Sequence, residues 1–144
     1  MIEIKDLNKT FANHKVLENL NCNIKTNSIY GLIGANGAGK STLLRIINDI
    51  FRKDSGTVLI DGQEIMNNEE LKQKLVFIPD DLYFMPNYTL KDMAIFYEAM
   101  YKNFDMNYLQ ELAKILKLDL KTKIQSFSKG MKRQCALICA LATN

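Results

Sequence analysis

The chain has 144 residues, of which 47% are hydrophobic and 24% charged, an ordinary composition for one globular domain. Its 19 basic and 16 acidic residues leave a net charge of +3, too small and dispersed to indicate a nucleic-acid partner. Three cysteines without paired spacing argue against a disulfide framework, and no apolar run has the form of a membrane span or signal peptide. We therefore expect a cytoplasmic protein without direct membrane insertion.

The N-terminal region predicts two antiparallel strands. Residues 1–7 alternate apolar and polar side chains, as a half-buried strand does, and residues 16–24 repeat the alternation. Polar turns are predicted over residues 8–14 and 25–27. Phe11 lies in the first of these turns and has two interpretations, which the sequence leaves open. It is either an aromatic packed over the sheet edge or a platform on which the base of a nucleotide stacks.

The next segment carries the most informative motif. Residues 34–42 match G-x-x-x-x-G-K-S/T, the phosphate-binding P-loop, at every fixed position. Its glycines let successive N–H groups point at one anion, Lys40 reaches the β- and γ-phosphates, and the Ser41 hydroxyl is placed to ligate Mg²⁺. The context agrees, because residues 28–33 predict a short buried strand and residues 41–47 a helix. The residues expected to hold ATP are Gly34, Asn36, Gly37, Ala38, Gly39, Lys40, Ser41 and Thr42.

Shorter elements follow the P-loop helix and a polar break. Residues 57–60 predict a strand, and Asp61-Gly62 is a strong hairpin signal. Residues 69–74 predict a short helix. Residues 75–78 form a second apolar run, which Pro79 ends.

The chain becomes helical from Thr89 onward, where apolar residues recur at a spacing of three to four. Asn103 or Asp105 is a candidate cap for the helix that follows. The organisation is therefore β-rich for about the first eighty residues and helical afterwards.

The last helix is predicted from Met131 to about Ala142, with Ser128 as its N-cap and Gly130 removing a side chain beside its first turn. Its residues are apolar nearly all round, which predicts a buried helix. Cys135 and Cys139 share one face of it. Because no histidine lies nearby, core packing is favoured for them over metal binding.

With these motifs in place, the chain resembles the ATP-binding cassette (ABC) ATPases, specifically the N-terminal portion of a transporter nucleotide-binding domain. Residues 54–62 are similar to the family's hairpin after the P-loop helix, residues 76–81 to the strand leading into its Q-loop, and residues 127–134 to its signature. The resemblance implies an α/β fold, a P-loop NTPase core with an N-terminal antiparallel β-subdomain and a helical subdomain, truncated at the C-terminus. We expect one partial domain over residues 1–144, with the parts about 1–80 (β-rich P-loop core), about 85–127 (helical subdomain) and 128–144 (signature helix).

The signature departs from the family's usual Leu-Ser-Gly-Gly-Gln. Phe127, Lys129 and Met131 replace three of the five residues, whereas Ser128 and Gly130 remain. The resemblance implies that Ser128 and Gly130 contact the γ-phosphate held by the P-loop of a second subunit, in a head-to-tail dimer. This variant is similar to those of bacterial drug and peptide exporters.

The Q-loop position departs as well. Asp80 stands where the family usually has glutamine, and Asp81 follows it. A carboxylate is a stronger, charged ligand for Mg²⁺, so one hypothesis is that Asp80 faces the metal together with Ser41. The alternative is that the two aspartates only solvate a loop.

The family's catalytic groups lie in segments that these 144 residues do not show, namely a strand ending in Asp-Glu and a later histidine. His14 comes too early to be that histidine, and no general base is identifiable. We therefore expect ATP binding with very slow hydrolysis by this chain alone. Because the P-loop strand lacks the neighbours that the family supplies, we also expect an exposed apolar edge.

The leading functional hypothesis is an ATP-binding subunit of an ABC membrane transporter that couples ATP binding and hydrolysis to export. It implies ATP and Mg²⁺, a second ATPase subunit, a transmembrane permease, and a position at the inner face of the cell membrane held through that partner. Residues 83–86 and Tyr88 are either the docking site of the permease or part of the helical core. The alternatives are a non-transport ABC protein acting on ribosomes or DNA, and a nucleotide-binding fragment without turnover.

Overall fold

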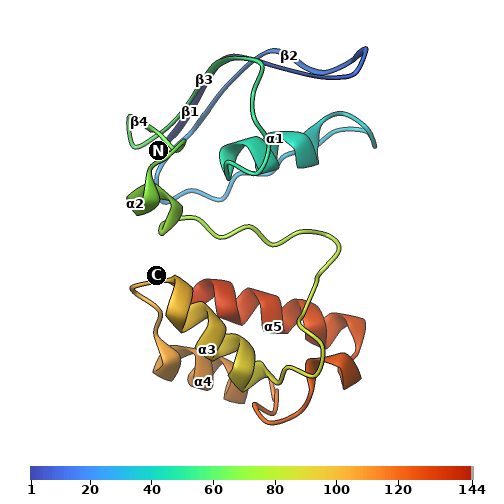
Figure 1. Ribbon diagram of the computed structural model, residues 1–144, viewed down its shortest axis with the longest axis vertical. Helices are drawn as coiled ribbons and strands as arrows, with labels where there is room; N and C mark the ends of the chain where they lie inside the picture. The colour runs from blue at the N-terminus through green and yellow to red at the C-terminus, as the bar shows by residue number, and fades with distance from the viewer. Residues whose placement is uncertain (144) are drawn as a thin grey trace. The chain divides into compact units, whose positions relative to one another are not determined.

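The computed structural model describes residues 1–143 and divides after Leu75 into two compact units. Figure 1 draws the first, residues 1–75, in blue to green and the second in green to red. We call them the β unit and the helical unit and describe each by itself. Asn144, the last residue of the predicted signature-helix segment, lies outside the described residues.

The β unit is built on an antiparallel sheet with strand order β2-β1-β3-β4. Ile4 in the central strand pairs with Cys22 on one side and with Val58 on the other. In β3 the alternate residues Val58 and Ile60 are buried, as a period-two pattern predicts, whereas the buried residues of β1, Ile4 and Leu7, lie three positions apart across a register shift. The strands are β1 (Ile2–Phe11), β2 (His14–Ile24), β3 (Ser55–Ile60) and β4 (Gln63–Glu64).

The first predicted turn, residues 8–14, is wrong. β1 continues to Phe11, which pairs with His14, so that only two residues connect the strands. Irregular pairing lets the polar residues of this part join the sheet: the Asn8 side chain accepts from the Asn19 N–H, and Asn19 has φ +45. Side-chain hydrogen bonds at a bulge replace ladder bonds, and the sequence alternation does not reveal them.

The Asp61-Gly62 hairpin is confirmed. Both residues have positive φ, 50° and 78°, as the tight turn between β3 and β4 requires. A short helix, α2 (Glu69–Lys72), follows within the predicted 69–74 range.

The P-loop helix is confirmed as α1 (Lys40–Ile47), and its apolar face packs on the sheet. The buried core of the β unit consists of Ile4, Leu7, Leu17, Leu43, Ile46, Ile47, Val58, Ile60, Ile65 and Leu71.

The strand predicted over residues 28–33 does not form, and the apolar run over residues 75–78, which overlaps the stretch similar to the family's Q-loop strand, is irregular as well. Residues 28–33 and 75–78 have no strand structure, and Ile29 and Ile33 are almost fully exposed, at 105% and 96%. A strand needs hydrogen-bonding neighbours, and no described strand pairs with either segment. Apolar composition alone therefore did not suffice to make them strands.

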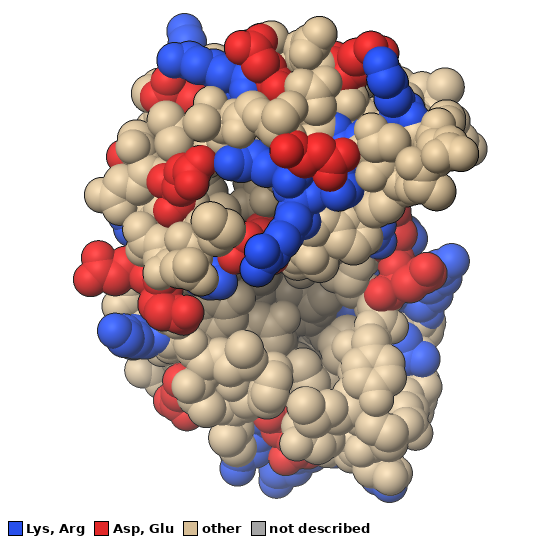
Figure 2. All heavy atoms as spheres, turned by 45° about the horizontal axis from the view of Figure 1, so that its top comes forward, with Lys and Arg blue, Asp and Glu red and all other residues tan. Residues whose placement is uncertain are grey.

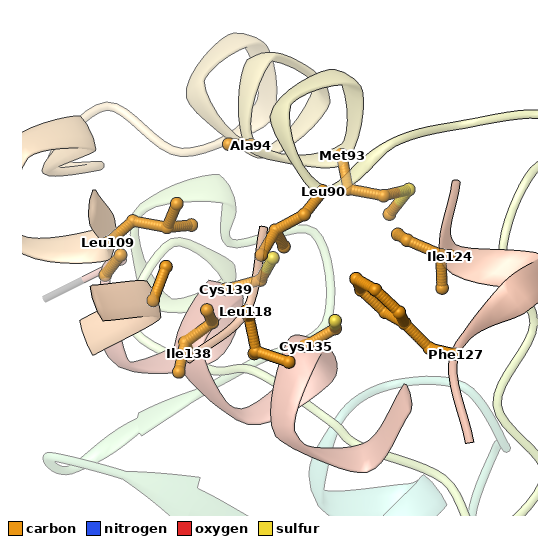
Figure 3. Close-up of a cluster of buried hydrophobic side chains, with 12 residues drawn as sticks. Leu90, Met93, Ala94, Leu109, Leu118, Ile124, Phe127, Cys135, Ile138 and Cys139 are labelled. Carbon is orange, nitrogen blue, oxygen red and sulfur yellow. The ribbon is translucent and has the colours of Figure 1, made fainter. Parts of the chain in front are cut away.

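The helical unit packs three helices around an apolar core (Figure 3). They are α3 (Leu90–Met100), α4 (Met106–Ile115) and α5 (Lys129–Leu141), and a short 3₁₀ turn, η1 (Ile124–Ser126), precedes the last. The core contains Leu90, Met93, Ala94, Leu109, Ala113, Leu118, Ile124, Phe127, Cys135, Ile138, Cys139 and Ala142.

Each of these three helices begins at a side-chain cap. Thr89 and Asp92 form a reciprocal capping box on α3, and Asp105, rather than Asn103, caps α4. Ser128 caps α5 as predicted. The prediction that this last helix is buried all round is wrong, because Leu137 and Leu141 are 47% and 41% exposed on the face away from the core.

Candidate nucleotide-binding site

The P-loop backbone turns at two glycines in the left-handed region. Gly37 has φ +85 and Gly39 has φ +82, which favours glycine at both positions. Gly39 also lies against β2: a Cβ there would come within 2.8 Å of both the Val16 carbonyl oxygen and Leu17 Cδ2. The loop is therefore shaped by its own glycines and seated on the sheet beneath it.

The lysine of the motif points back over its own loop. Its Nζ donates to the carbonyl oxygens of Gly34 and Ala35, both at 2.7 Å. Gly34 leaves room for this arrangement, since a Cβ there would lie 3.3 Å from Ala38 Cβ and 3.9 Å from Lys40 Cδ. The ammonium group thus lies over the concave side of the loop, where a phosphate would sit.

The N-terminus of α1 has no side-chain cap. The first N–H groups of a helix have no acceptor within it, so this end attracts an anion. Exposed Ser41 and half-buried Thr42 lie in this first turn, and Leu43 closes it by donating to the Gly39 carbonyl at 2.8 Å. Asn36, Gly37 and Ala38 lie exposed in the preceding loop. These groups fit a triphosphate.

The donor set suits magnesium only in part. The Ser41 hydroxyl is an oxygen donor of the kind that Mg²⁺ accepts alongside phosphate oxygens and water. Among residues 1–143, no three His, Cys, Asp or Glu side chains gather into a group that could hold a metal ion. A magnesium ion here would therefore depend on the nucleotide for much of its coordination.

Phe11 combines features of both interpretations. Its ring packs edge to face against Phe51, with centroids 5.6 Å apart, and Lys9 Nζ lies 5.1 Å from its centroid. The residue nevertheless remains 41% exposed. It therefore packs on Phe51 while leaving part of its surface accessible.

The signature residues lie in the helical unit, at the start of α5. Ser128 Oγ accepts from the Met131 N–H at 3.2 Å. Gly130 is exposed, and the nearest atom to a Cβ there would be Ser128 Oγ at 3.9 Å, so the helix start is open on this side. Phe127 is only 7% exposed and belongs to the core, which accounts for an apolar side chain at this position.

Asp80 also lies in the helical unit and is exposed in the segment before α3. Ser41, the other residue of that hypothesis, belongs to the β unit. Its neighbour Asp81 lines a cavity of about 160 Å³ in the same unit. The other lining residues are Phe77, Ile78, Pro79, Leu82, Tyr83, Phe84, Met93, Tyr97 and Ala136.

The segment expected either to dock a permease or to join the core contains both exposed and packed aromatic residues. Tyr83 is 81% exposed, whereas Phe84 and Tyr88 pack against the helical core. Tyr83 and Phe84 both line the cavity beside Asp81. The sequence signal, a cluster of aromatics after Pro79, did not separate the buried rings from the exposed one.

The two cysteines of α5 are core residues, as predicted. Both are free and buried, and burial raises the pKa of Cys135 to about 11 and that of Cys139 to about 12. Thiols with such pKa values stay protonated at neutral pH and bind metals poorly.

The sequence analysis missed the neighbours of Phe11. Phe51 and Asp54 lie in the polar break that follows the P-loop helix, residues 51–56, yet both contact the end of β1. An aromatic residue within a polar stretch was the available signal. On the face seen in Figure 2, basic and acidic side chains are interspersed.

Comparison with known proteins places the chain among ABC transporter ATP-binding proteins. The family model for the ABC transporter matches residues 17–144. A relative from Bacillus subtilis (strain 168), named ABC transporter ATP-binding protein YtrB, is 35% identical over 142 residues, which are 99% of this chain and 49% of the relative. The methionine import ATP-binding protein MetN of Clostridium tetani (strain Massachusetts / E88) is also 35% identical, over 98% of this chain and 48% of its own.

A solved structure shares the fold. It is the dimeric, post-hydrolysis ATP-binding cassette MJ0796 bound to ADP and Pi, with a TM-score of 0.83 and 25% identity over 100% of this chain and 70% of that one. The chain spans about half the length of the curated relatives above. In the described residues, no helix is both long and apolar enough to cross a membrane. By its sequence match and its fold, the chain belongs to the ABC transporter family.

Proposed function

We propose that this chain binds ATP with Mg²⁺ as part of the ATPase subunit of an ABC transporter. The observation that carries the proposal is the P-loop itself. Gly37 and Gly39 take left-handed conformations, Lys40 lies over the concave side of the loop, and α1 begins uncapped at its end. These features together supply backbone donors, a fixed positive charge and a helix dipole for one polyanion.

In this proposal each part of the nucleotide has its own contacts. Lys40 exchanges its two loop carbonyls for the β- and γ-phosphates, and the N–H groups around Gly37 to Thr42 donate to phosphate oxygens. The base stacks on Phe11. Mg²⁺, when bound, neutralises phosphate charge, and Ser41 would hold it, with Asp80 as a second candidate ligand.

The partners of the site are also proposals. Ser128 and Gly130 of a second subunit would close over the γ-phosphate, and the dimeric MJ0796 cassette supports such an arrangement. A transmembrane permease would be the second partner, docking near exposed Tyr83 and holding the chain at the inner face of the membrane. Export rests only on the Lys129 and Met131 signature variant, whereas MetN is named for import.

Turnover is expected to be very slow in this chain alone. Positioning and charge neutralisation account for binding, but phosphoryl transfer to water also needs a group that orients the water. No residue of the chain is assigned that role. ATP binding, rather than hydrolysis, is therefore the activity to measure first.

The test is calorimetric titration with MgATP, with phosphate release assayed in parallel. Lys40→Ala should weaken binding by about 10- to 100-fold, since hydrogen bonds to charged groups contribute about 1.5–3 kcal/mol. Lys15→Ala is the matched control, because Lys15 is exposed and forms an ion pair with Glu18, which is also exposed, at 2.9 Å. Equal affinities of the Lys40→Ala variant and the unmodified protein would refute P-loop binding.

A second measurement addresses the rival in which the chain acts on ribosomes or DNA. The mixed charge of the face in Figure 2 does not favour a polyanionic partner. Co-purification from membranes with a transmembrane protein supports the transporter, and salt-sensitive co-sedimentation with ribosomes or DNA supports the rival.

A further inference from the structure

The ring of Phe11 is held by the segment that follows α1. The Phe51 ring meets it at an interplanar angle of 71°. On α1, the Arg45 guanidinium lies 5.4 Å from the centroid of Phe51. Edge-to-face aromatic pairs and cation–π contacts both restrict ring orientation, so Phe51 limits the positions open to Phe11.

Phe51 is itself fixed to the P-loop helix. The Arg45 carbonyl oxygen accepts hydrogen bonds from the Ile50 N–H at 2.8 Å and from the Phe51 N–H at 3.2 Å. These bonds satisfy a carbonyl that the end of a helix leaves without an intrahelical donor. The helix that begins at Lys40 thus carries at its other end the ring that supports Phe11.

Asp54 holds the strand end that carries Phe11. β1 extends beyond its last pair with β3, Asn8 with Ser55, so the residues after Asn8 have no strand on that side. The Asp54 carboxylate replaces the missing strand: one oxygen accepts from the Thr10 N–H at 2.7 Å, and the other from Lys9 Nζ at 2.7 Å.

The same carboxylate fixes a cation over the ring. Lys9 pairs with Asp54, its side chain is only 14% exposed, and its Nζ lies 5.1 Å from the Phe11 centroid. Hydrogen bonds from Lys9 and Thr10 hold the pKa of Asp54 below its ordinary value, so the carboxylate is ionised at neutral pH. Asp54 therefore acts on Phe11 through both the backbone and the lysine.

We propose that Phe51 and Asp54 are positioning residues for the nucleotide base, because they fix the orientation of the Phe11 ring on which that base stacks. The inference rests on the proposed stacking of the base on Phe11. It assigns neither residue a contact with phosphate or metal. Their effect should therefore be confined to ligands that carry a base.

The test compares a ligand that carries a base with one that does not. The full chain is titrated with two magnesium complexes, ATP and inorganic tripolyphosphate, which share the phosphate chain and differ in the nucleoside. Phe11→Ala should weaken ATP binding by about 5- to 100-fold, the range for loss of one base–aromatic stack. Phe51→Ala and Asp54→Ala should weaken it by about 2- to 10-fold through the misplaced ring. None of the three should change tripolyphosphate affinity by as much as about 2-fold.

Two further variants separate positioning from general damage. Asp54→Asn keeps an acceptor for the Thr10 N–H and should recover part of the ATP affinity. Asp49→Ala removes a different ion pair of the same unit, to Lys72 at 3.0 Å, and should bind both ligands as the unmodified protein does. Circular dichroism of every variant verifies the fold.

The outcomes distinguish this inference from the function on which it rests. Failure of the unmodified protein to bind tripolyphosphate refutes the phosphate site, and an unchanged ATP affinity in Phe11→Ala refutes base stacking; either removes the basis of the inference. Loss of ATP affinity in Phe11→Ala alone, with Phe51→Ala and Asp54→Ala binding normally, overturns the positioning role only. Equal loss of both ligands in Phe51→Ala and Asp54→Ala also overturns it, because the damage is then general.

Discussion

The β unit and the helical unit differ in how their apolar segments are built into regular structure. In the helical unit, Leu90 and Leu109 are fully buried, and each of α3, α4 and α5 begins at a polar cap. In the β unit the sheet and α1 form a comparable core, yet Ile29 and Ile33, just before the P-loop, lie almost fully exposed.

The difference follows from where each kind of element finds its hydrogen bonds. A helix satisfies its backbone within itself and needs only caps and one covered face, so local sequence determines it. A strand needs a neighbour that is distant in the chain. The apolar segment over residues 28–33 has no such neighbour among the described strands and therefore stays irregular.

The largest predicted effect is a loss of stability that is confined to the β unit. Gly56 has φ +87, and a Cβ there would overlap the Asp6 carbonyl and come within 2.6 Å of the Lys5 carbonyl oxygen. Gly56→Ala should lower the free energy of unfolding by about 3 kcal/mol, because overpacking adds to left-handed strain. Hydrogen exchange read by mass spectrometry should show lost protection in β1 and β3 and not in α3.

The matched control is Gly62→Ala. Gly62 has a similar φ of +78, but no atom lies within 4 Å of a Cβ built there. This variant should lose only roughly 1–2 kcal/mol, the strain term by itself. Equal losses in the two variants would show that the close approach to β1 has no energetic effect.

The second prediction is a loss of stability in the helical unit. Leu90 is 0% exposed, and Leu90→Ala should cost about 2–5 kcal/mol through the cavity it leaves. Ile115→Ala is the control in the same unit, since Ile115 is 72% exposed, and it should change stability by no more than about 0.5 kcal/mol. Urea titration followed by helical circular dichroism measures both. If Leu90→Ala also removes protection from β1, the two units unfold together rather than independently.

A third, smaller effect tests whether caps explain the order of the helical unit. Asp105 accepts from the Tyr108 N–H at 3.0 Å at the start of α4. Asp105→Ala should destabilise the unit by about 1 kcal/mol, the usual effect of losing an N-cap. Glu111→Ala, on the exposed face of the same helix, is the comparison and should be nearly neutral. Equal free energies of unfolding for the two variants in urea titration would contradict the proposed contribution of the cap.

The smallest effect is a pH dependence in the capping box of α3. Hydrogen bonds from the Thr89 N–H and hydroxyl hold the pKa of Asp92 below its ordinary 3.8. A carboxyl whose pKa is lower in the folded state stabilises that state above its unfolded pKa, and this contribution is lost as the pH falls through the folded value. The helical unit should therefore lose stability on acidification below about pH 4.

Asp92→Asn isolates that contribution, because an amide oxygen can still accept from Thr89 but does not titrate. Thermal unfolding measured from pH 7 down to pH 3 should give a flatter acid slope for this variant than for the unmodified protein. Superimposable slopes would assign the acid sensitivity to other carboxylates.

Local chemistry was predictable from sequence, and distant pairing was not. Ser128 was predicted as a cap and Asp61-Gly62 as a hairpin, because each depends on a few adjacent residues. The strand character of Asn8 was not foreseen, since its side-chain bonds to Asn19 and Ser55 come from other strands.

The candidate site shows the same division. The P-loop motif predicted the positions of Lys40 and of the helix after it, because its fixed residues dictate the backbone. The contacts of Phe11 with Phe51, and of Asp54 with Thr10, join segments about forty residues apart. Periodicity within one segment carries no information about such contacts.

The seating of Gly39 on Val16 and Leu17 has a consequence for the order of folding. β1 and β2 are joined by a two-residue turn, so the loss of chain entropy on closing this hairpin is small. During synthesis the hairpin leaves the ribosome before the P-loop does, and it presents the surface on which the loop rests. The phosphate-binding loop is therefore expected to take its shape early, before the helical unit has been translated.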